Sequence, residues 1–173
     1  MAIPRVVRDR PIAAAPPRSP FIIQRMPPAR DDHPNDRRVV EVDIPSDVAF
    51  IERVVELVRR ECELKAFGTR QIMLNVPVAL TEALSNAILR GNGDDPAKHV
   101  HVRAEVDTNR LVVEVGDEGK GFDMDGSLID PTTPENLGRE DGRGLFLMKK
   151  LMDQVERVEL PHGSMVRMTL NRA

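Results

Sequence analysis

The sequence has little cysteine and few aromatic residues: one Cys, no Trp or Tyr and five Phe among 173 residues. With Cys62 as the only cysteine, an internal disulfide and a thiolate metal cage are excluded, which favours a reducing, cytoplasmic environment. No apolar run reaches the roughly 18 to 20 residues that span a bilayer, so we expect no membrane segment. Neither a P-loop nor a dinucleotide-binding fingerprint occurs in the chain.

Prolines and charges are distributed unevenly along the chain. Residues 1–38 hold eight of the 14 prolines and eight arginines against four aspartates, a net charge of +4. Residues 39–173 hold 17 basic and 24 acidic residues, a net charge of −7. Because dense Pro and Arg bury little apolar surface, we predict a disordered tail over 1–38 and one folded domain over 39–173. The acidic body with few aromatics argues against direct nucleic-acid binding.

Hydrophobic periodicity in the body predicts an α+β two-layer sandwich, with helices packed on one face of a mixed, mostly antiparallel sheet. The other face is expected to be partly open to solvent or to a partner. Ser46 is expected to cap the first helix, and Pro77 to kink the second or to lie in the first turn of its second half. Strands are expected at residues 39–44, 100–106, 111–115, 155–160 and 165–170, and helices at 47–65, 70–89 and 144–154.

Glu82 and Asn86 lie one helical turn apart, on a face flanked by Ala79 and Ala83. The small alanines would let a ligand approach closely. A carboxylate can polarise a hydroxyl group or water, and a carboxamide oxygen can coordinate a hard cation. Taken alone, the pair also fits an ordinary solvated helix face.

Asp117, Gly119 and Gly121 directly follow the strand at 111–115. A carboxylate at a strand end can accept a hydrogen bond from an exocyclic amine, and the glycines let the backbone come near a flat ring or a phosphate. The other reading is a Gly-rich turn. The loop of residues 116–141 is long for a compact domain, which favours a functional role such as a lid.

Gly142, Arg143 and Gly144 open the third predicted helix. The free N–H groups and the positive end of the helix dipole attract phosphate oxygens at such a position. An ordinary flexible helix start is the other reading.

The order and spacing of these three segments resemble the GHKL ATPase/kinase superfamily, which includes gyrase, MutL and histidine kinases. Residues 80–88 look like its N box, Asp117-x-Gly119-x-Gly121 resembles its first glycine box, and Gly142-x-Gly144-Leu-Phe-Leu-Met its second. The short size, the Gly-Phe-Asp after the first box and the Leu-Met-Asp-Gln-Val at the end of the last helix are similar to the anti-sigma-factor serine kinases of the RsbW and SpoIIAB type. This resemblance covers about residues 39–172 and implies the Bergerat-type ATP-binding fold.

The resemblance also implies a role for individual residues. Glu82 would be the general base acting on the attacking hydroxyl, Asn86 would bind Mg²⁺, and Asp117 would accept from the adenine amine. Ser164 lies near the position where the family often has a Thr close to that aspartate. The remaining glycine-box residues would border the base and ribose (Gly119, Gly121) or the phosphates (Gly142, Arg143, Gly144).

The chain departs from the family pattern just before the second glycine box. Family members often have a basic residue there, to neutralise the γ-phosphate, but this chain has Glu140 and Asp141. Arg139 or Arg143 could supply the cation, and we assign Arg143 to the catalytic set. His99 and His101 share one strand face, but the sequence offers no evident third metal ligand.

The resemblance implies an ATP- and Mg²⁺-dependent protein-serine kinase that also sequesters a sigma factor. Its phosphoacceptor would be an anti-sigma-factor antagonist in a partner-switching pathway, and a homodimer is suggested by the resemblance and by the open sheet face. Three alternatives stay open at this stage. They are an ATP-binding anti-sigma module without transfer, a detached histidine-kinase-type catalytic domain, and a plain ATPase.

Overall fold

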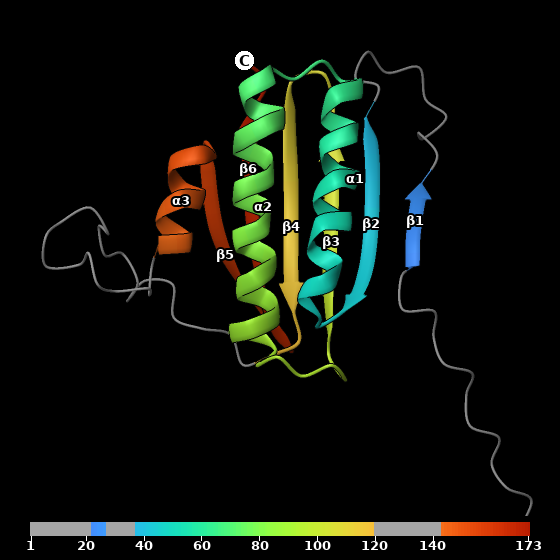
Figure 1. The fold of residues 1–173 in the computed structure, drawn as a ribbon, viewed down its shortest axis with the longest axis vertical. Helices are drawn as coiled ribbons and strands as arrows, with labels where there is room; N and C mark the ends of the chain where they lie inside the picture. The colour runs from blue at the N-terminus through green and yellow to red at the C-terminus, as the bar shows by residue number, and fades with distance from the viewer. Residues whose placement is uncertain (1–21, 27–36, 120–142) are drawn as a thin grey trace, which may run out of the picture.

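The computed structural model describes residues 22–26, 37–119 and 143–173, which fold into one layer of helices on one sheet (Figure 1). The strands lie side by side in the order β1-β2-β3-β4-β6-β5. All five described pairings are antiparallel, so the predicted α+β sandwich is confirmed with a sheet that contains no parallel pair among the described strands. The strands are β1 (Ile22–Met26), β2 (Arg38–Pro45), β3 (His99–Val106), β4 (Arg110–Asp117), β5 (Gln154–Leu160) and β6 (Gly163–Asn171).

The helices cover one face of this sheet (Figure 1). A short 3₁₀ turn, η1 (Val48–Phe50), leads into α1 (Ile51–Leu64), and α3 (Arg143–Leu151) lies beside the long central helix. The central helix is α-helical only in its middle, α2 (Val76–Ser85), and has wider π-type turns on both sides, η2 (Gln71–Asn75) and η3 (Asn86–Gly91). Pro77 occupies the first turn of α2, where its missing N–H costs least.

The core forms between the helices and alternate residues of the strands. Val100, Val102, Ala104 and Val106 of β3 are all buried, as the alternation of the sequence predicts. On the helical side, the buried residues include Val54, Val58 and Cys62 of α1 and Val76, Leu80, Leu84 and Ile88 of the central helix.

The start of the first helix differs from the prediction. Asp47, not Ser46, is the N-cap, and its Oδ1 accepts a hydrogen bond from Ala49 N at 2.9 Å. Ser46 is instead buried, and its Oγ donates to Lys98 O at 3.1 Å. Asx and Ser side chains compete for the same capping role, and the tertiary bond to Lys98 takes Ser46 away from it.

The strand β1 lies within residues 1–38, for which no ordered structure is expected from composition. It pairs with β2 from Ile22↔Asp43 to Met26↔Val39. Between Pro20 and Pro27 the sequence contains no proline, so each residue keeps the N–H that a strand ladder requires. β2 also begins at Arg38, one residue before the predicted domain boundary. Residues 1–21 and 27–36 of the tail lie outside the described residues.

The central helix is the one described helix that is long and apolar enough to cross a membrane. It spans 21 residues, Gln71–Gly91, whereas no such run is expected from the sequence. Its apolar composition has a local cause, because the side chains of Val76, Leu80, Leu84 and Ile88 form part of the core. A buried core helix meets the same length and composition criterion.

We expect the Cys62 thiol to be unreactive in the folded protein. Burial, and then the nearby charges of Glu61 and Glu63, raise its pKa to about 12. Because the thiolate is the reactive form, alkylation by iodoacetamide at pH 8 should be roughly a thousandfold slower than in the denatured chain. Mass spectrometry of the alkylated protein, with and without denaturant, measures this ratio, and equal rates would contradict the burial of α1 against the sheet.

Candidate functional site

Glu82, Asn86 and Gly144 meet where α2 packs against α3. A Cβ atom placed on Gly144 would lie 2.4 Å from Glu82 Oε2 and 3.4 Å from Asn86 Nδ2. The absence of a side chain at Gly144 therefore lets the start of α3 approach both polar groups. Glu82 and Asn86 are half-buried, so their polar atoms remain open to a ligand. The structure thus brings together the first and third predicted segments.

Asp117 forms a second polar cluster at the end of β4. The carboxylate is buried, and its Oδ2 accepts from Ser164 Oγ at 2.7 Å while Oδ1 accepts from Gly119 N at 2.9 Å. Ser164 reaches this position because it stands directly opposite Asp117 in the β4–β6 register. An ionised carboxylate has about four acceptor positions, so Asp117 can still accept a hydrogen bond from a ligand.

Three glycines give the backbone close access to Asp117. A Cβ on Gly91 would lie 2.5 Å from Asp117 Cγ, and one on Gly119 would lie 1.5 Å from Gly91 O. Gly163 has a φ of +114°, and its Cβ would lie 1.8 Å from Asp117 O. Any side chain at these positions would displace the carboxylate or the strand end that carries it.

We expect Gly119→Ala to disrupt this cluster, because the new methyl group would overlap Gly91 O. The cost of such overpacking is about 1–3 kcal/mol of unfolding free energy, together with weaker ligand binding. Gly116→Ala is the matched control, since a Cβ there meets nothing closer than 3.8 Å. Thermal unfolding of both variants tests this, and equal melting temperatures would contradict it.

The two clusters lie at opposite ends of η3, which begins at Asn86 and ends at Gly91. The helix turn therefore links the Glu82–Asn86–Gly144 cluster to the Asp117 cluster. Arg143 is exposed at the first described residue of α3, next to Gly144. The other predicted residues of the loop and second box, Gly121, Arg139, Glu140, Asp141 and Gly142, lie outside the described residues.

Sequence reasoning missed two residues that pack against Asp117, Gly91 and Gly163. Gly91 and Gly163 appear in the sequence only as residues that end a helix or form a turn. The signal that identifies them is steric contact with Asp117, which depends on how η3 and the β5–β6 turn pack against β4. The hydrophobic periodicity of the sequence does not predict that contact.

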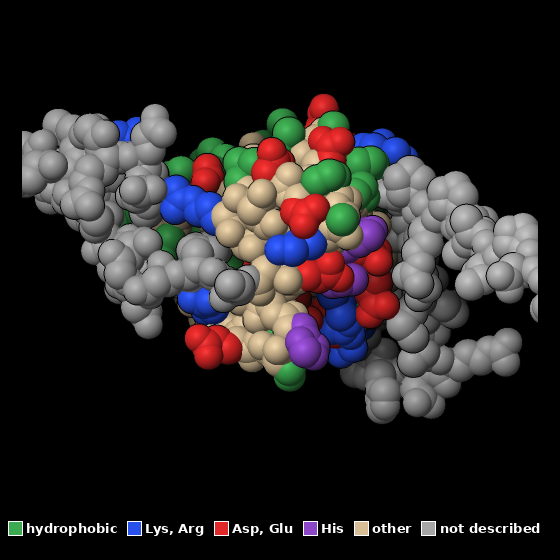
Figure 2. Space-filling view, turned by 90° about the horizontal axis from the view of Figure 1, so that it is seen from below, with side chains coloured by type: hydrophobic (Ala, Val, Ile, Leu, Met, Phe, Trp, Pro, Cys, Tyr) green, Lys and Arg blue, Asp and Glu red, His purple; other side chains and the backbone are tan. Residues whose placement is uncertain are grey.

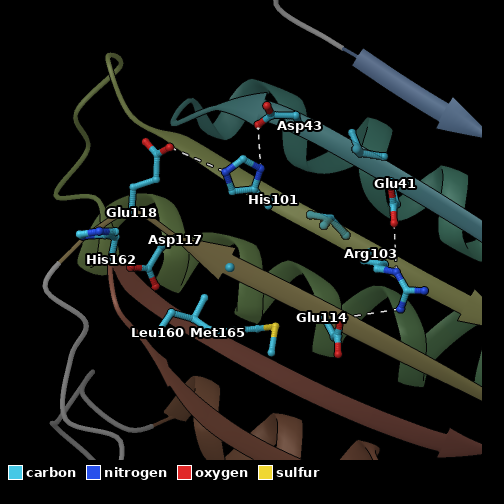
Figure 3. A pocket seen from close by; sticks show the side chains of 13 residues that line it. Glu41, Asp43, His101, Arg103, Glu114, Asp117, Glu118, Leu160, His162 and Met165 are labelled. Atoms are coloured by element: carbon cyan, nitrogen blue, oxygen red, sulfur yellow. Dashed lines mark hydrogen bonds and ion pairs between the residues drawn. The ribbon is translucent and has the colours of Figure 1, made fainter.

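A cavity of about 560 Å³, lined in part by Asp117 and Glu118, opens on the face of the sheet opposite the helices (Figure 3). His101 lies at its edge between two carboxylates, with Nδ1 3.2 Å from Asp43 Oδ1 and Nε2 3.7 Å from Glu118 Oε1. Seen from below, His, Asp and Glu, and Lys and Arg side chains lie together at the lower right, whereas the hydrophobic side chains at the top have charged ones among them (Figure 2). Within the described ranges, no group of three or more His, Cys, Asp or Glu is arranged to hold a metal ion.

Arg103 organises the charges on this open face. Its Nε lies 3.0 Å from Glu41 Oε1, and its guanidinium also pairs with Glu105. Nearby, Arg167 Nη2 lies 2.8 Å from Glu114 Oε1. Partial burial lowers the pKa of Arg103, but the neighbouring carboxylates, Glu105 first, raise it overall. The charged side chains named here therefore form pairs of opposite charge on the open face of the sheet.

Comparisons with known proteins show the family of this chain. Residues 44–170 match the histidine kinase-like ATPase domain. The chain is 31% identical over 140 residues to the serine-protein kinase RsbW of Bacillus subtilis (strain 168), which covers 78% of this chain and 86% of the relative. It is 33% identical over 135 residues to RsbW of Bacillus velezensis, covering 75% and 83%.

A second group of relatives carries the name anti-sigma F factor. The protein of that name from Thermoanaerobacter sp. (strain X514) is 30% identical over 103 residues, covering 58% of this chain and 71% of the relative. The family match extends over both polar clusters and the helix turn that links them. The chain therefore belongs to the histidine kinase-like ATPase family and, within it, to the anti-sigma kinases of the RsbW type.

Proposed function

We propose that this protein is an ATP-dependent protein-serine kinase and anti-sigma factor. The observation that carries the proposal is the pair of polar clusters at the two ends of η3, Glu82–Asn86–Gly144 and Asp117–Ser164. The first cluster offers a general base, Glu82, and a cation ligand, Asn86, beside a helix N-terminus. The second cluster offers the buried carboxylate of Asp117. The first cluster suits the phosphates of a nucleotide, and the second suits its nucleobase.

The Asp117 end is suited to adenine. Its carboxylate is held in one orientation by Ser164 and Gly119, and it retains acceptor capacity for an exocyclic amine. Gly91 and Gly119 pack closely around it, because a Cβ on either residue would overlap the Asp117 carboxylate or Gly91 O.

At the other end, Glu82 would accept the proton of the attacking serine hydroxyl. Phosphoryl transfer depends mostly on positioning and on charge neutralisation. The N-terminus of α3 and Arg143 would supply positive charge near the phosphates, because free N–H groups and the helix dipole point toward that end.

The polar groups near Gly144 fit a magnesium ion. Mg²⁺ is usually held by one or two protein oxygens together with substrate phosphates and water. Asn86 would supply the protein ligand, and its half-buried carboxamide lies beside the start of α3. When bound, the ion would neutralise phosphate charge.

The partners of the protein follow from the names of its relatives. We propose a sigma factor as the binding partner and an anti-sigma-factor antagonist as the phosphoacceptor, in a partner-switching pathway in the cytoplasm. The acidic body, with a charge of −7 over residues 39–173, would complement a basic DNA-binding surface of a sigma factor. The open sheet face is available for a second copy of the chain.

Incubation with γ-labelled ATP and a candidate antagonist, followed by phosphosite mapping, tests the kinase activity. An acid-stable phosphoserine on the antagonist is expected. An acid-labile phosphate would instead indicate a histidine kinase, and ATP turnover without a labelled protein would indicate a plain ATPase. Nucleotide binding with neither turnover nor label would indicate an anti-sigma module without transfer.

A further inference from the structure

Asn92 occupies a junction of three chain segments. It follows η3, is 2% exposed, and uses its whole carboxamide in hydrogen bonds. Nδ2 donates to Ser46 Oγ at 2.7 Å and to His99 O at 2.9 Å, while Oδ1 accepts from Glu118 N at 2.8 Å. The side chain thus joins the end of β2, the start of β3 and the segment that follows β4.

The third of these bonds reaches the proposed nucleotide site. Glu118 lies between Asp117, whose carboxylate would accept the adenine amine, and Gly119, whose N–H donates to that carboxylate. Its own carboxylate accepts from His99 N at 2.9 Å, so the residue is held through its backbone and its side chain. Its backbone anchor is Asn92.

Asn92 is itself fixed in place. Its N–H donates to Ala87 O at 2.8 Å, which ties it to the last turn of η3. The same turn carries Gly91, against which Gly119 packs closely. A movement of the Asn92 side chain would therefore change the position of the Glu118 peptide relative to η3, which forms the opposite wall of the Asp117 cluster.

We infer that Asn92 is a positioning residue for the adenine end of the site, acting through the Glu118 backbone on Asp117 and Gly119. The inference rests on the proposed nucleotide binding. Loss of the anchor would leave the Glu118 N–H without its acceptor and would let the segment after β4 move away from η3. Because ATP and ADP share adenine, both nucleotides should be affected equally.

The test is Asn92→Ala in the full chain, compared with Ser46→Ala. The Ser46 variant removes one partner of Asn92 but none of the bonds to Glu118. Calorimetry with Mg²⁺·ATP and Mg²⁺·ADP, well below each melting temperature, should show the dissociation constants of Asn92→Ala raised roughly tenfold for both nucleotides. Those of Ser46→Ala should stay within about twofold of the unmodified chain. In a kinase assay, the KM for ATP should rise while kcat stays unchanged, a split that general destabilisation does not produce.

Asn92→Asp decides the question if the alanine variant does not fold, because it keeps the size and the acceptor oxygen of Asn92. In this variant, the protection of the Glu118 amide from hydrogen exchange and the affinity for ATP should either both be retained or both be lost. Affinity lost with the amide still protected, or kept with the amide exposed, overturns the inference. So does an Asn92→Ala variant that binds as tightly as Ser46→Ala. If the unmodified chain binds no nucleotide, the proposed function fails first, and the two failures are therefore distinguishable.

Discussion

Replacing Asp117 with Asn is expected to weaken Mg²⁺·ATP binding by about 10- to 100-fold and to leave the protein folded. The Ser164 hydroxyl can rotate to accept from the new amide, and Gly119 N can still donate to the remaining oxygen, so the local packing survives. The adenine amine, however, loses an ionised acceptor. Hydrogen bonds to charged groups contribute about 1.5–3 kcal/mol, which sets the expected size of the effect. Isothermal titration calorimetry measures it.

Asp107→Asn is the matched control for this variant. Asp107 also accepts from backbone N–H groups, those of Asn109 at 2.6 Å and Arg110 at 2.9 Å, but in the β3–β4 turn, far along both strands from Asp117. It loses the same charge and should bind ATP within about twofold of the unmodified chain. Equal affinities in the two variants would show that Asp117 does not contact the base.

Replacing Glu82 with Gln is expected to lower serine phosphorylation by at least about 100-fold, because an amide cannot accept the hydroxyl proton. The two side chains have nearly the same size, so the close approach of Gly144 to this position is preserved. Binding of ATP and of the sigma factor should therefore change by less than about threefold. Initial rates of label transfer from γ-labelled ATP to the antagonist give the first value, and calorimetry gives the second.

The control for Glu82→Gln is Glu52→Gln, on the exposed first turn of α1. It makes the same chemical change away from both polar clusters and should leave the transfer rate unaltered. A Glu82→Gln variant that still transfers phosphate at the original rate would exclude Glu82 as the base. A variant that also loses ATP affinity would assign Glu82 to binding instead.

Much of the fold follows from local pattern. The alternation in β3 and β4 describes a face that must be buried, and the structure buries it. In the helical stripe predicted at residues 48, 51, 55, 58 and 62, Val58 and Cys62 are buried, Ile51 and Val55 are partly buried, and Val48 is exposed. Differences occur where a long-range contact competes with a local rule. Ser46 bonds to Lys98 and leaves the helix cap to Asp47, and Ile22–Met26 forms a strand because the edge of β2 is available for pairing.

The candidate site shows the same division between local and long-range information. Glu82, Asn86, Asp117 and Gly144 are recognisable from their residue types and spacing, because the family pattern is local in sequence. Gly91, Asn92 and Gly163 are not, because their importance lies in contacts with Asp117 and Glu118 across the fold.

The sequence by itself determined the family, the α+β class and the principal polar residues, since these depend on periodicity and on motifs of a few residues. The scarcity of cysteine and aromatic residues limited the classes of site that the chain could contain. Only the tertiary structure decided that Ser164 faces Asp117, that Gly144 approaches Glu82, and that Asn92 joins three segments. The reason is physical: strand register and helix packing place residues up to 62 positions apart within contact distance, and no local propensity encodes such separations.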